Sequence, residues 1–386
     1  MARKHNTKIS RKPAKAATVH PWPVTQLIVG ISWLYWLVLK SLQVSLIDAQ
    51  PSALIAGIGI LVFLLMMGCV LAVVHYADQL AEILKEPYGT LVLTLTSTSI
   101  EVSLMLKVML QGDHNSSLLR DTVFAGLMIT MNLMVGLALS AGSWRHIEQS
   151  FNLRGASAFV QLIAPMSLFL LIMPNYTTSS TGPTLVPLQE AYLGVLCVVV
   201  YLLFLSIQTG RHKALFANSQ SEQSHQANQL PCNNKLKPIL MASFGLILSL
   251  LPMVLLSDYL GEAINYGVDE LNLPLALGGL LIGFLGLIPE MIGACRAALA
   301  NQIQRSINIC LGSALSTIGL TVPCIMLLAA YLNMDLILGV AGSNSILLLA
   351  TLLVTMLTFA SGASSILQGI VHILLFIGYI IFILLP

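Results

Sequence analysis

The chain has 386 residues, of which 56% are hydrophobic and only 9% are charged, and its mean hydropathy is +0.86. A soluble protein of this length needs far more charge on its surface, so lipid must be the solvent for most of the chain. The formal net charge of +2 indicates little about partners, and we expect no nucleic acid among them. The cysteines form no C-x-x-C pair, so neither a disulfide framework nor a zinc site is indicated.

The first 23 residues are basic and run into an apolar stretch, 24–46, that has no clear cleavage site. We interpret this stretch as an uncleaved leading helix. A bilayer core takes about 20 apolar residues as a helix, and ten further stretches are long enough. They are 52–80, 88–111, 118–142, 156–174, 187–208, 237–257, 273–299, 304–332, 336–358 and 363–385. The predicted fold class is therefore an all-α polytopic membrane protein with about 11 transmembrane helices.

Basic residues indicate how these helices are oriented. With the N-terminus in the cytoplasm, fifteen of the eighteen Lys and Arg residues fall on the cytoplasmic side, all except Lys40, Lys107 and Arg120. Lys and Arg prefer that side, so we expect the N-terminus inside and the C-terminus outside. A polar segment, 209–236, is rich in Ser, Asn and Gln and is expected to be a cytoplasmic linker with no part in transport.

Two stretches carry a lone carboxylate in apolar surroundings. Gly89 precedes Glu101 by twelve residues, and Gly278 precedes Glu290 by twelve residues. A basic residue follows six positions after each glutamate, Lys107 and Arg296. By the orientation above, the two helices run in opposite directions. We therefore expect two five-helix repeats of inverted topology, 52–208 and 237–386, which is typical of secondary transporters.

A charge at the centre of a membrane-spanning helix costs roughly 2.5–3.5 kcal/mol by the lower estimates. Inverted repeats would bring Glu101 and Glu290 to one central site, where the carboxylates would titrate as a pair. Such a pair can hold either one divalent cation or protons, which is the minimum that cation/proton exchange requires. These two residues are the predicted cation and proton ligands.

Small polar residues near the glutamates are candidates for further ligands, since hydroxyl and amide oxygens suit Ca²⁺ and Na⁺. The alternative for each is an ordinary hydrogen bond between helices. The carbonyl of Leu285 is a further candidate, because Pro289 lacks the N–H that would bind it. His75 and His372 are candidates for a proton relay, the alternative being structural hydrogen bonds. The candidate side-chain ligands are Thr94, Ser97, Thr98, Asn132, Asn308 and Ser313.

Three segments carry a family resemblance: HYADQLAEILKEPYGTLVLTLTSTSIEVSL, IPEMIGACRAALANQIQRSINICLGSALSTIGLTVP and SILQGIVHILLFIGYI. Together they resemble the bacterial ChaA-type calcium/proton (sodium/proton) antiporters of the cation/Ca²⁺ exchanger superfamily. The resemblance covers residues 25–386 and implies one leading helix, two inverted five-helix repeats and a paired-glutamate site. The family often has Gly-Asn three to four positions before each glutamate, whereas this chain has Ser97-Thr98 and Gly286-Leu287.

The resemblance implies a secondary antiporter that exchanges Ca²⁺, and also Na⁺, for H⁺ across the bacterial inner membrane. The alternative is a monovalent Na⁺/K⁺ antiporter that does not carry Ca²⁺. An ion channel is disfavoured because no filter-like carbonyl loop is apparent, and an enzyme because H-E-x-x-H and G-x-S-x-G are absent. The expected partners are the transported ions and lipid, with a homo-oligomer left open. We expect no cofactor besides the transported cation.

Overall fold

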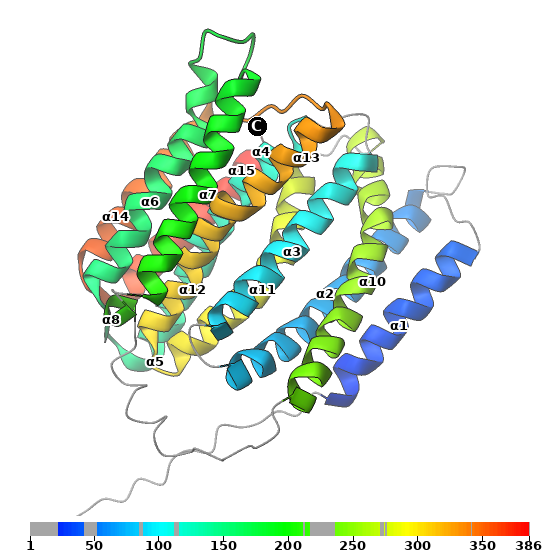
Figure 1. The fold of residues 1–386 in the computed structure, drawn as a ribbon, viewed down its shortest axis with the longest axis horizontal. Helices are drawn as coiled ribbons and strands as arrows, with labels where there is room; N and C mark the ends of the chain where they lie inside the picture. Colours follow the sequence, from blue (N-terminus) through cyan, green and yellow to red (C-terminus); the bar gives the residue numbers. More distant parts are fainter. Residues whose placement is uncertain are drawn as a thin grey trace, which may run out of the picture.

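The computed structural model describes residues 22–41, 52–84, 88–111, 116–210, 213–216, 236–270, 274, 276–340 and 342–385. The basic N-terminal segment and most of the predicted linker lie outside these residues. The first part of the chain forms one leading helix and then a series of long helices (Figure 1). These elements are α1 Trp22–Ser41, α2 Ser52–Leu84, α3 Tyr88–Gln111, α4 Leu118–Met128, η1 Ile129–Met134, α5 Val135–His146, β1 Gln149–Ser150, α6 Leu153–Leu171, η2 Met173–Asn175, α7 Pro187–Thr209 and α8 Lys213–Phe216.

The second part of the chain repeats the pattern of a very long helix, a glutamate-bearing helix and an interrupted helix. Its elements are α10 Leu236–Asp269, α11 Ala276–Leu299, α12 Ile303–Ser316, η3 Thr317–Thr321, α13 Val322–Leu332, α14 Ser343–Ala360, β2 Ala363–Ser364 and α15 Ile366–Leu384. The predicted fold class, an all-α polytopic membrane protein, is confirmed. The repeat boundaries near 208 and 237 stay a prediction.

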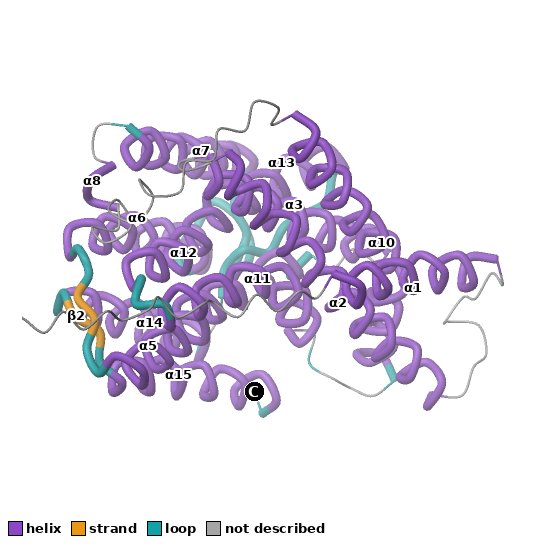
Figure 2. The backbone as a smooth tube through the Cα atoms, turned by 90° about the horizontal axis from the view of Figure 1, so that it is seen from below, coloured by secondary structure: helices purple, strands orange, loops and turns teal. Residues whose placement is uncertain are grey.

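Ten helical stretches in the described part of the chain are long and apolar enough to span a membrane. Helix α3 is not among them, because a run of Thr and Ser, together with Glu101 and Lys107, makes it more polar. It nevertheless packs between α2, α10 and α11, inside the bundle (Figure 1). Figure 2, which views the bundle from below, places α11 near its centre. The two glutamate-bearing helices therefore lie between the layer formed by α1, α2 and α10 and the remaining helices.

Both halves contain a short π-helix at corresponding places. The helix after α3 is interrupted by η1, and the helix after α11 is interrupted by η3. The sequences TMNLMV, from Thr130, and TIGLTV, from Thr317, share Thr, Leu and Val at the same positions. At η3, Pro323 lacks an N–H and so disturbs the regular helical ladder just ahead of it. Single-turn π-helices are frequent at functional sites, which draws attention to both segments.

Several helices differ in extent from their predicted ranges. Helix α10 continues to Asp269, beyond the predicted end at 257. The prediction was too short because it followed hydropathy, and the last turns of the helix are more polar than the rest. The last-but-one helix begins at Ser343 rather than at 336, and residues 336–340 are not helical. In that segment the Val340 N–H donates to the Leu171 carbonyl at 2.7 Å, which ties it to α6.

A two-residue antiparallel pairing, β1 with β2, joins the α5–α6 connection to the α14–α15 connection. Gln149 pairs with Ser364 and Ser150 pairs with Ala363. The next residue, Phe151, donates its N–H to the carbonyl of Gly362, whose φ of 75° favours glycine. This pairing links the two halves of the chain at one end of the bundle.

Candidate cation site

Glu101 lies past the middle of α3, and its side chain is only 4% exposed. The preceding turn supplies Ser97 and Thr98, which are also buried. Hydroxyl side chains can enter a membrane helix because they bond to carbonyls of their own turn, as Ser99 Oγ does with the Leu95 carbonyl at 2.7 Å. The local sequence thus makes a continuous helix that carries a polar stripe and one carboxylate.

The hydrogen bonds of Glu101 come from the other half of the chain. Thr321 Oγ1 donates to Glu101 Oε2 at 2.8 Å, and Thr317 Oγ1 lies 3.2 and 3.3 Å from the two carboxylate oxygens. Both threonines belong to η3 and are four positions apart, so they share one face of that helix. The second π-helix therefore supports the carboxylate of the first glutamate.

Glu290 lies on α11 and is 3% exposed. Ser313 Oγ on α12 donates to Glu290 Oε2. Ser97 from the first half lies within hydrogen-bonding reach of the same carboxylate, and its hydroxyl donates to the Gly286 carbonyl at 2.9 Å. Since one hydroxyl hydrogen serves one acceptor at a time, Ser97 can turn between that carbonyl and the carboxylate.

The two glutamates form one site. Gly286, one turn before Glu290, lies so close to Glu101 that a Cβ there would be 2.5 Å from Glu101 Cγ. The two carboxylates are near enough for their charges to interact. The three ion pairs found among the described residues all lie elsewhere, so neither carboxylate is paired with a Lys or Arg there. Two buried carboxylates without a cationic side chain need protons or a metal cation to balance their charge.

A further buried hydroxyl lies on the turn before Glu101 and has no partner among the described residues. Thr98 Oγ1 is fully buried, and it makes no hydrogen bond within the described part of the chain. It lies three residues before Glu101, on the turn that also carries Ser97. A buried hydroxyl without a partner is costly, so this oxygen fits a position where a cation or water would bind. Thr94, one turn earlier, is partly buried.

The predicted ligand Asn132 and the predicted proton-relay residue His372 form hydrogen bonds away from the glutamates. Asn132 Nδ2 donates to Thr351 Oγ1 at 2.8 Å, and its Oδ1 lies 3.3 Å from His372 Nδ1. The other ring nitrogen of His372 lies 3.0 Å from Thr358 Oγ1. This buried network joins η1 to α14 and α15. None of these hydrogen bonds involves either glutamate.

Asn308 and His75 also bond elsewhere. Asn308 Nδ2 donates to the Phe216 carbonyl at 2.7 Å, and its Oδ1 accepts from Gln304 at 2.9 Å. His75 Nε2 lies 3.0 Å from Gln79 Nε2 on its own helix, α2. The structure thus brings Ser97 and Ser313 into contact with the glutamate pair and places Asn132 and Asn308 in other hydrogen bonds.

Of the two residues that support Glu101, Thr317 is one of the small polar residues that the sequence places in the span after Glu290, whereas Thr321 is not among the candidates predicted from the sequence. The signal that could have found Thr321 is the spacing of Ser313, Thr317 and Thr321, since hydroxyls four positions apart form a stripe on one helix face. The prediction used positions near each glutamate in the sequence and so gave little weight to the far half of the chain.

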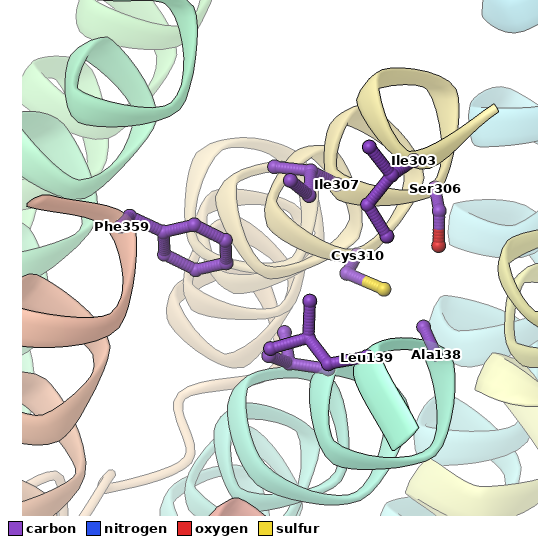
Figure 3. Close-up of a pocket in the computed structure, with 8 residues that line it drawn as sticks. Ala138, Leu139, Ile303, Ser306, Ile307, Cys310 and Phe359 are labelled. Atoms are coloured by element: carbon purple, nitrogen blue, oxygen red, sulfur yellow. The ribbon is translucent and has the colours of Figure 1, made fainter. Parts of the chain in front are cut away.

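A small pocket elsewhere in the bundle is apolar and does not belong to this site. It lies between α5, α12 and α14, and Leu139, Cys310 and Phe359 point into it (Figure 3). The pocket is too narrow to hold a water molecule. Ser306, its one hydroxyl, already donates to the Ala294 carbonyl at 2.8 Å. We therefore regard the pocket as a packing defect.

The family of the chain follows from a match to a sequence profile. The profile of the sodium/calcium exchanger protein family matches residues 54–210 and 241–385. The chain belongs to this family. The two matched segments lie on either side of the polar linker and each contains one of the two glutamates. The predicted resemblance to the cation/Ca²⁺ exchanger superfamily is confirmed.

Relatives in the sodium/calcium exchanger family cover most of the chain. A protein of Sinorhizobium fredii described as an ionic transporter, y4hA, is 37% identical over 323 residues, which is 83% of this chain and 87% of that protein. The sodium-potassium/proton antiporter ChaA of Escherichia coli is 30% identical over 336 residues, 86% of this chain and 90% of ChaA. The resemblance to ChaA-type antiporters is confirmed by this match.

A solved structure has the same fold. The Ca²⁺/H⁺ antiporter protein YfkE superposes with a TM-score of 0.70 over 94% of this chain and 100% of that chain, at 12% sequence identity. At this identity the similarity concerns the fold alone. The chain is thus a multi-pass membrane protein of the exchanger family.

Proposed function

We propose that this protein is a secondary active antiporter that exchanges Ca²⁺, and also Na⁺, for H⁺ by alternating access around Glu101 and Glu290. The observation that carries the proposal is the pair of buried carboxylates from two helices that run in opposite directions, ringed by hydroxyls from both halves. Membership of the exchanger family and the name of ChaA support the proton-coupled reaction.

The chemistry of the pair explains why exchange would be coupled. An empty site would hold two negative charges in surroundings of low polarity, which is very unfavourable. Binding one divalent cation neutralises both charges, and so does binding two protons. The site can therefore change its exposure readily when loaded with either cargo but not when empty, which couples cation movement in one direction to proton movement in the other.

The charge and ligands of the site favour Ca²⁺. Two carboxylates carry −2, which balances one Ca²⁺, whereas Na⁺ leaves one charge unless a proton stays on one glutamate. Ca²⁺ takes six to eight oxygen ligands in a flexible arrangement. The carboxylates can be joined by Ser97, Thr98, Ser313 and the carbonyl that Pro289 leaves without its helical partner. We propose that Asn132 and Asn308 are not direct ligands, because their side chains are bonded elsewhere, and that Thr94, one turn before Thr98, stays a candidate ligand.

The alternative is a monovalent cation/proton antiporter without Ca²⁺ transport. The relative that favours it is ChaA, whose name specifies sodium and potassium. The same site could carry Na⁺ if one glutamate kept its proton, since the charge would again be balanced. Proton flux in everted vesicles, with Ca²⁺, Na⁺ and K⁺ added one at a time, distinguishes the two. A response to Na⁺ or K⁺ with none to Ca²⁺ at any pH would establish the alternative.

We further propose where the protein works and what it needs. The bacterial relatives support a bacterial cytoplasmic membrane, and the distribution of Lys and Arg supports an orientation with the N-terminus inside and the C-terminus outside. In Figure 1, α1 begins at one end of the bundle and the C-terminus lies at the other. Lipid would surround the outward-facing apolar side chains, and assembly into a homo-oligomer is left open. The protein would not be an enzyme and would need no cofactor, because the cations that it binds are transported.

For the two histidines we propose different roles. His372 is bonded to Asn132 and Thr358, so its expected task is to hold η1 against α14 and α15 rather than to relay protons. His75 lies on α2 beside Gln79, near the end of the helix that leads to the predicted cytoplasmic face. It remains the candidate for passing protons between that face and the site.

The central test is removal of each carboxylate charge. Glu101→Gln and Glu290→Gln keep the size of the side chain, and each should abolish cation-dependent proton flux in everted vesicles while insertion and folding remain normal. Glu148→Gln, on an exposed connection, makes the same chemical change away from the site and should leave flux unchanged. Near-normal flux in either site variant would overturn the proposal.

A further inference from the structure

Two short motifs recur on the long first helix of each half. Helix α2 carries Asp78-Gln-Leu-Ala-Glu82, and α10 carries Asp258-Tyr-Leu-Gly-Glu262. The shared pattern is D-x-L-x-E, and in both helices it lies in the C-terminal part. Because α2 and α10 begin the two halves, the motifs lie on corresponding helices, with Asp78 six residues before the end of α2 and Asp258 eleven residues before the end of α10.

The aspartate of each motif pairs with a base on the other half. Lys107 Nζ lies 3.1 Å from Asp258 Oδ1, which joins α3 to α10. Arg296 Nη1 lies 3.9 Å from Asp78 Oδ2, which joins α11 to α2. Each base stands six residues after the glutamate of its own helix. The two ion pairs are therefore equivalent contacts between opposite halves, although nothing in the reaction chemistry uses them.

The pairs lie toward opposite ends of the bundle. A rise of 1.5 Å per residue places each base about 9 Å beyond its glutamate along the helix. Since α3 and α11 run in opposite directions (Figure 1), one pair lies on each side of the glutamate site. We call the ends the Lys107 end and the Arg296 end. By the predicted orientation these are the outer and the inner end.

The pairs are not equally closed in this structure. At the Lys107 end both side chains are 35% exposed, whereas at the Arg296 end the exposed fractions are 69% for Arg296 and 48% for Asp78. The longer distance and the greater exposure both indicate a looser contact at the Arg296 end. One pair is thus shorter and less exposed than the other, as expected if the two alternate.

We propose that Lys107–Asp258 and Arg296–Asp78 are two latches that hold α10 and α2 against the glutamate-bearing helices at opposite ends, so that their alternate closing decides which face the site opens toward. This inference rests on the proposed antiport function. The four residues are positioning residues, because none of them touches either glutamate. Exposed ion pairs are weak, which suits contacts that must break in every cycle. The strongest exposed pairs change the ratio of closed to open protein by about fivefold.

The measurement that tests the latches is the apparent KM for the cation from each face. Affinity falls in proportion to the fraction of protein that is open to the side being measured. Everted and right-side-out vesicles give the two values, and their ratio reports the preferred direction of opening. Lys107→Ala/Asp258→Ala should shift this ratio by up to about fivefold toward tighter apparent binding from the Lys107 end. Arg296→Ala/Asp78→Ala should shift it in the opposite direction, by a smaller factor because that pair is already loose.

The double alanine variants separate a latch from simple attraction of cations. Each removes one positive and one negative charge, so the net charge at that end is unchanged while the contact is lost. The charge swap Lys107→Asp/Asp258→Lys restores a contact and should return the ratio toward that of the unmodified protein. Arg145→Ala/Glu148→Ala likewise removes one positive and one negative charge, from exposed positions at the end of α5 and in the connection after it, and should leave the ratio unchanged.

Ratios that shift in opposite directions for the two pairs, with recovery in the charge swap, support the latches. An unchanged ratio in both double variants, or shifts in the same direction, overturns them. If one double variant fails to insert, the sign of the shift in the other still decides. Failure of the antiport function itself would appear differently, as an absence of cation-dependent proton flux in the unmodified protein.

Discussion

Gly286 offers a sharp test of how closely the glutamate site is packed. A Cβ at this position would lie 2.5 Å from Cγ of Glu101 and 3.6 Å from both Cβ and Cδ. Ordinary contact begins near 3.4 Å, so in Gly286→Ala the Glu101 side chain must move by about 0.9 Å. Misplacement of a functional group by about 1 Å can cost on the order of 100-fold in rate. We expect a loss of that size in cation-dependent proton flux.

The matched control is Gly293→Ala, on the same helix and one turn beyond Glu290. A Cβ there would meet only Ile309 Cδ1, at an ordinary distance of 3.7 Å. Alanine is a better helix former than glycine by about 1 kcal/mol, so both substitutions should favour α11 equally. Flux measured with a pH-sensitive dye in everted vesicles should fall for Gly286→Ala and stay within about twofold for Gly293→Ala, the change expected of an uncrowded site.

The amount of inserted protein and its thermal midpoint should be similar in the two alanine variants. If Gly286→Ala transports as well as Gly293→Ala, Glu101 is not held where the structure places it. The reasoning about the site would then be wrong, even if the fold is right.

Three further outcomes are expected. Thr321→Val should weaken cation binding about tenfold, since hydrogen bonds to charged groups contribute about 1.5–3 kcal/mol. Thr130→Val in η1, whose hydroxyl bonds to nearby carbonyls, should leave cation affinity unchanged. Equal affinities of the two variants by calorimetry would contradict this. Thr98→Val should lower cation affinity without lowering the thermal midpoint, because no protein hydrogen bond is lost, and unchanged affinity would remove Thr98 from the ligands. Apparent Ca²⁺ affinity should rise with pH, because protons and Ca²⁺ compete for the same carboxylates, and up to two protons should be released per Ca²⁺ bound. An affinity that does not change with pH, measured with ⁴⁵Ca²⁺, would exclude direct competition.

The sequence was sufficient to predict the helices whose composition is uniform. The range 88–111 coincides with α3, and 187–208 ends one residue before α7 does. Hydropathy fails where a helix continues into polar residues, as α10 does through Asp258 to Asp269. It also fails at 336–340, an apolar run that is not helical and whose backbone N–H groups at 337–340 bond to neighbouring segments.

The prediction of the candidate site was limited in a different way. Spacing within each half identified the two glutamates, and the inverted orientation explained why they should meet. No local pattern states that position 101 faces position 321, because that contact depends on how the halves pack. Asn132 and Asn308 are helical residues in the expected spans, but their side chains bond to α14 and to the Phe216 carbonyl. Helical position alone does not give the direction of a side chain in a bundle.

The π-helix η3 has a consequence for how the chain tolerates length changes. A π-turn holds one residue more than an α-turn, so losing one residue between Thr317 and Thr321 would let the segment relax into regular α-helix. The bundle could absorb that deletion without a break. The residues after the deletion would keep their faces, so the Thr321 hydroxyl would still lie toward Glu101. In a regular α-helix such as α12, by contrast, losing one residue turns everything after it by about 100°. A single-codon deletion is therefore expected to be far less harmful at η3 than in the regular turns on either side of it.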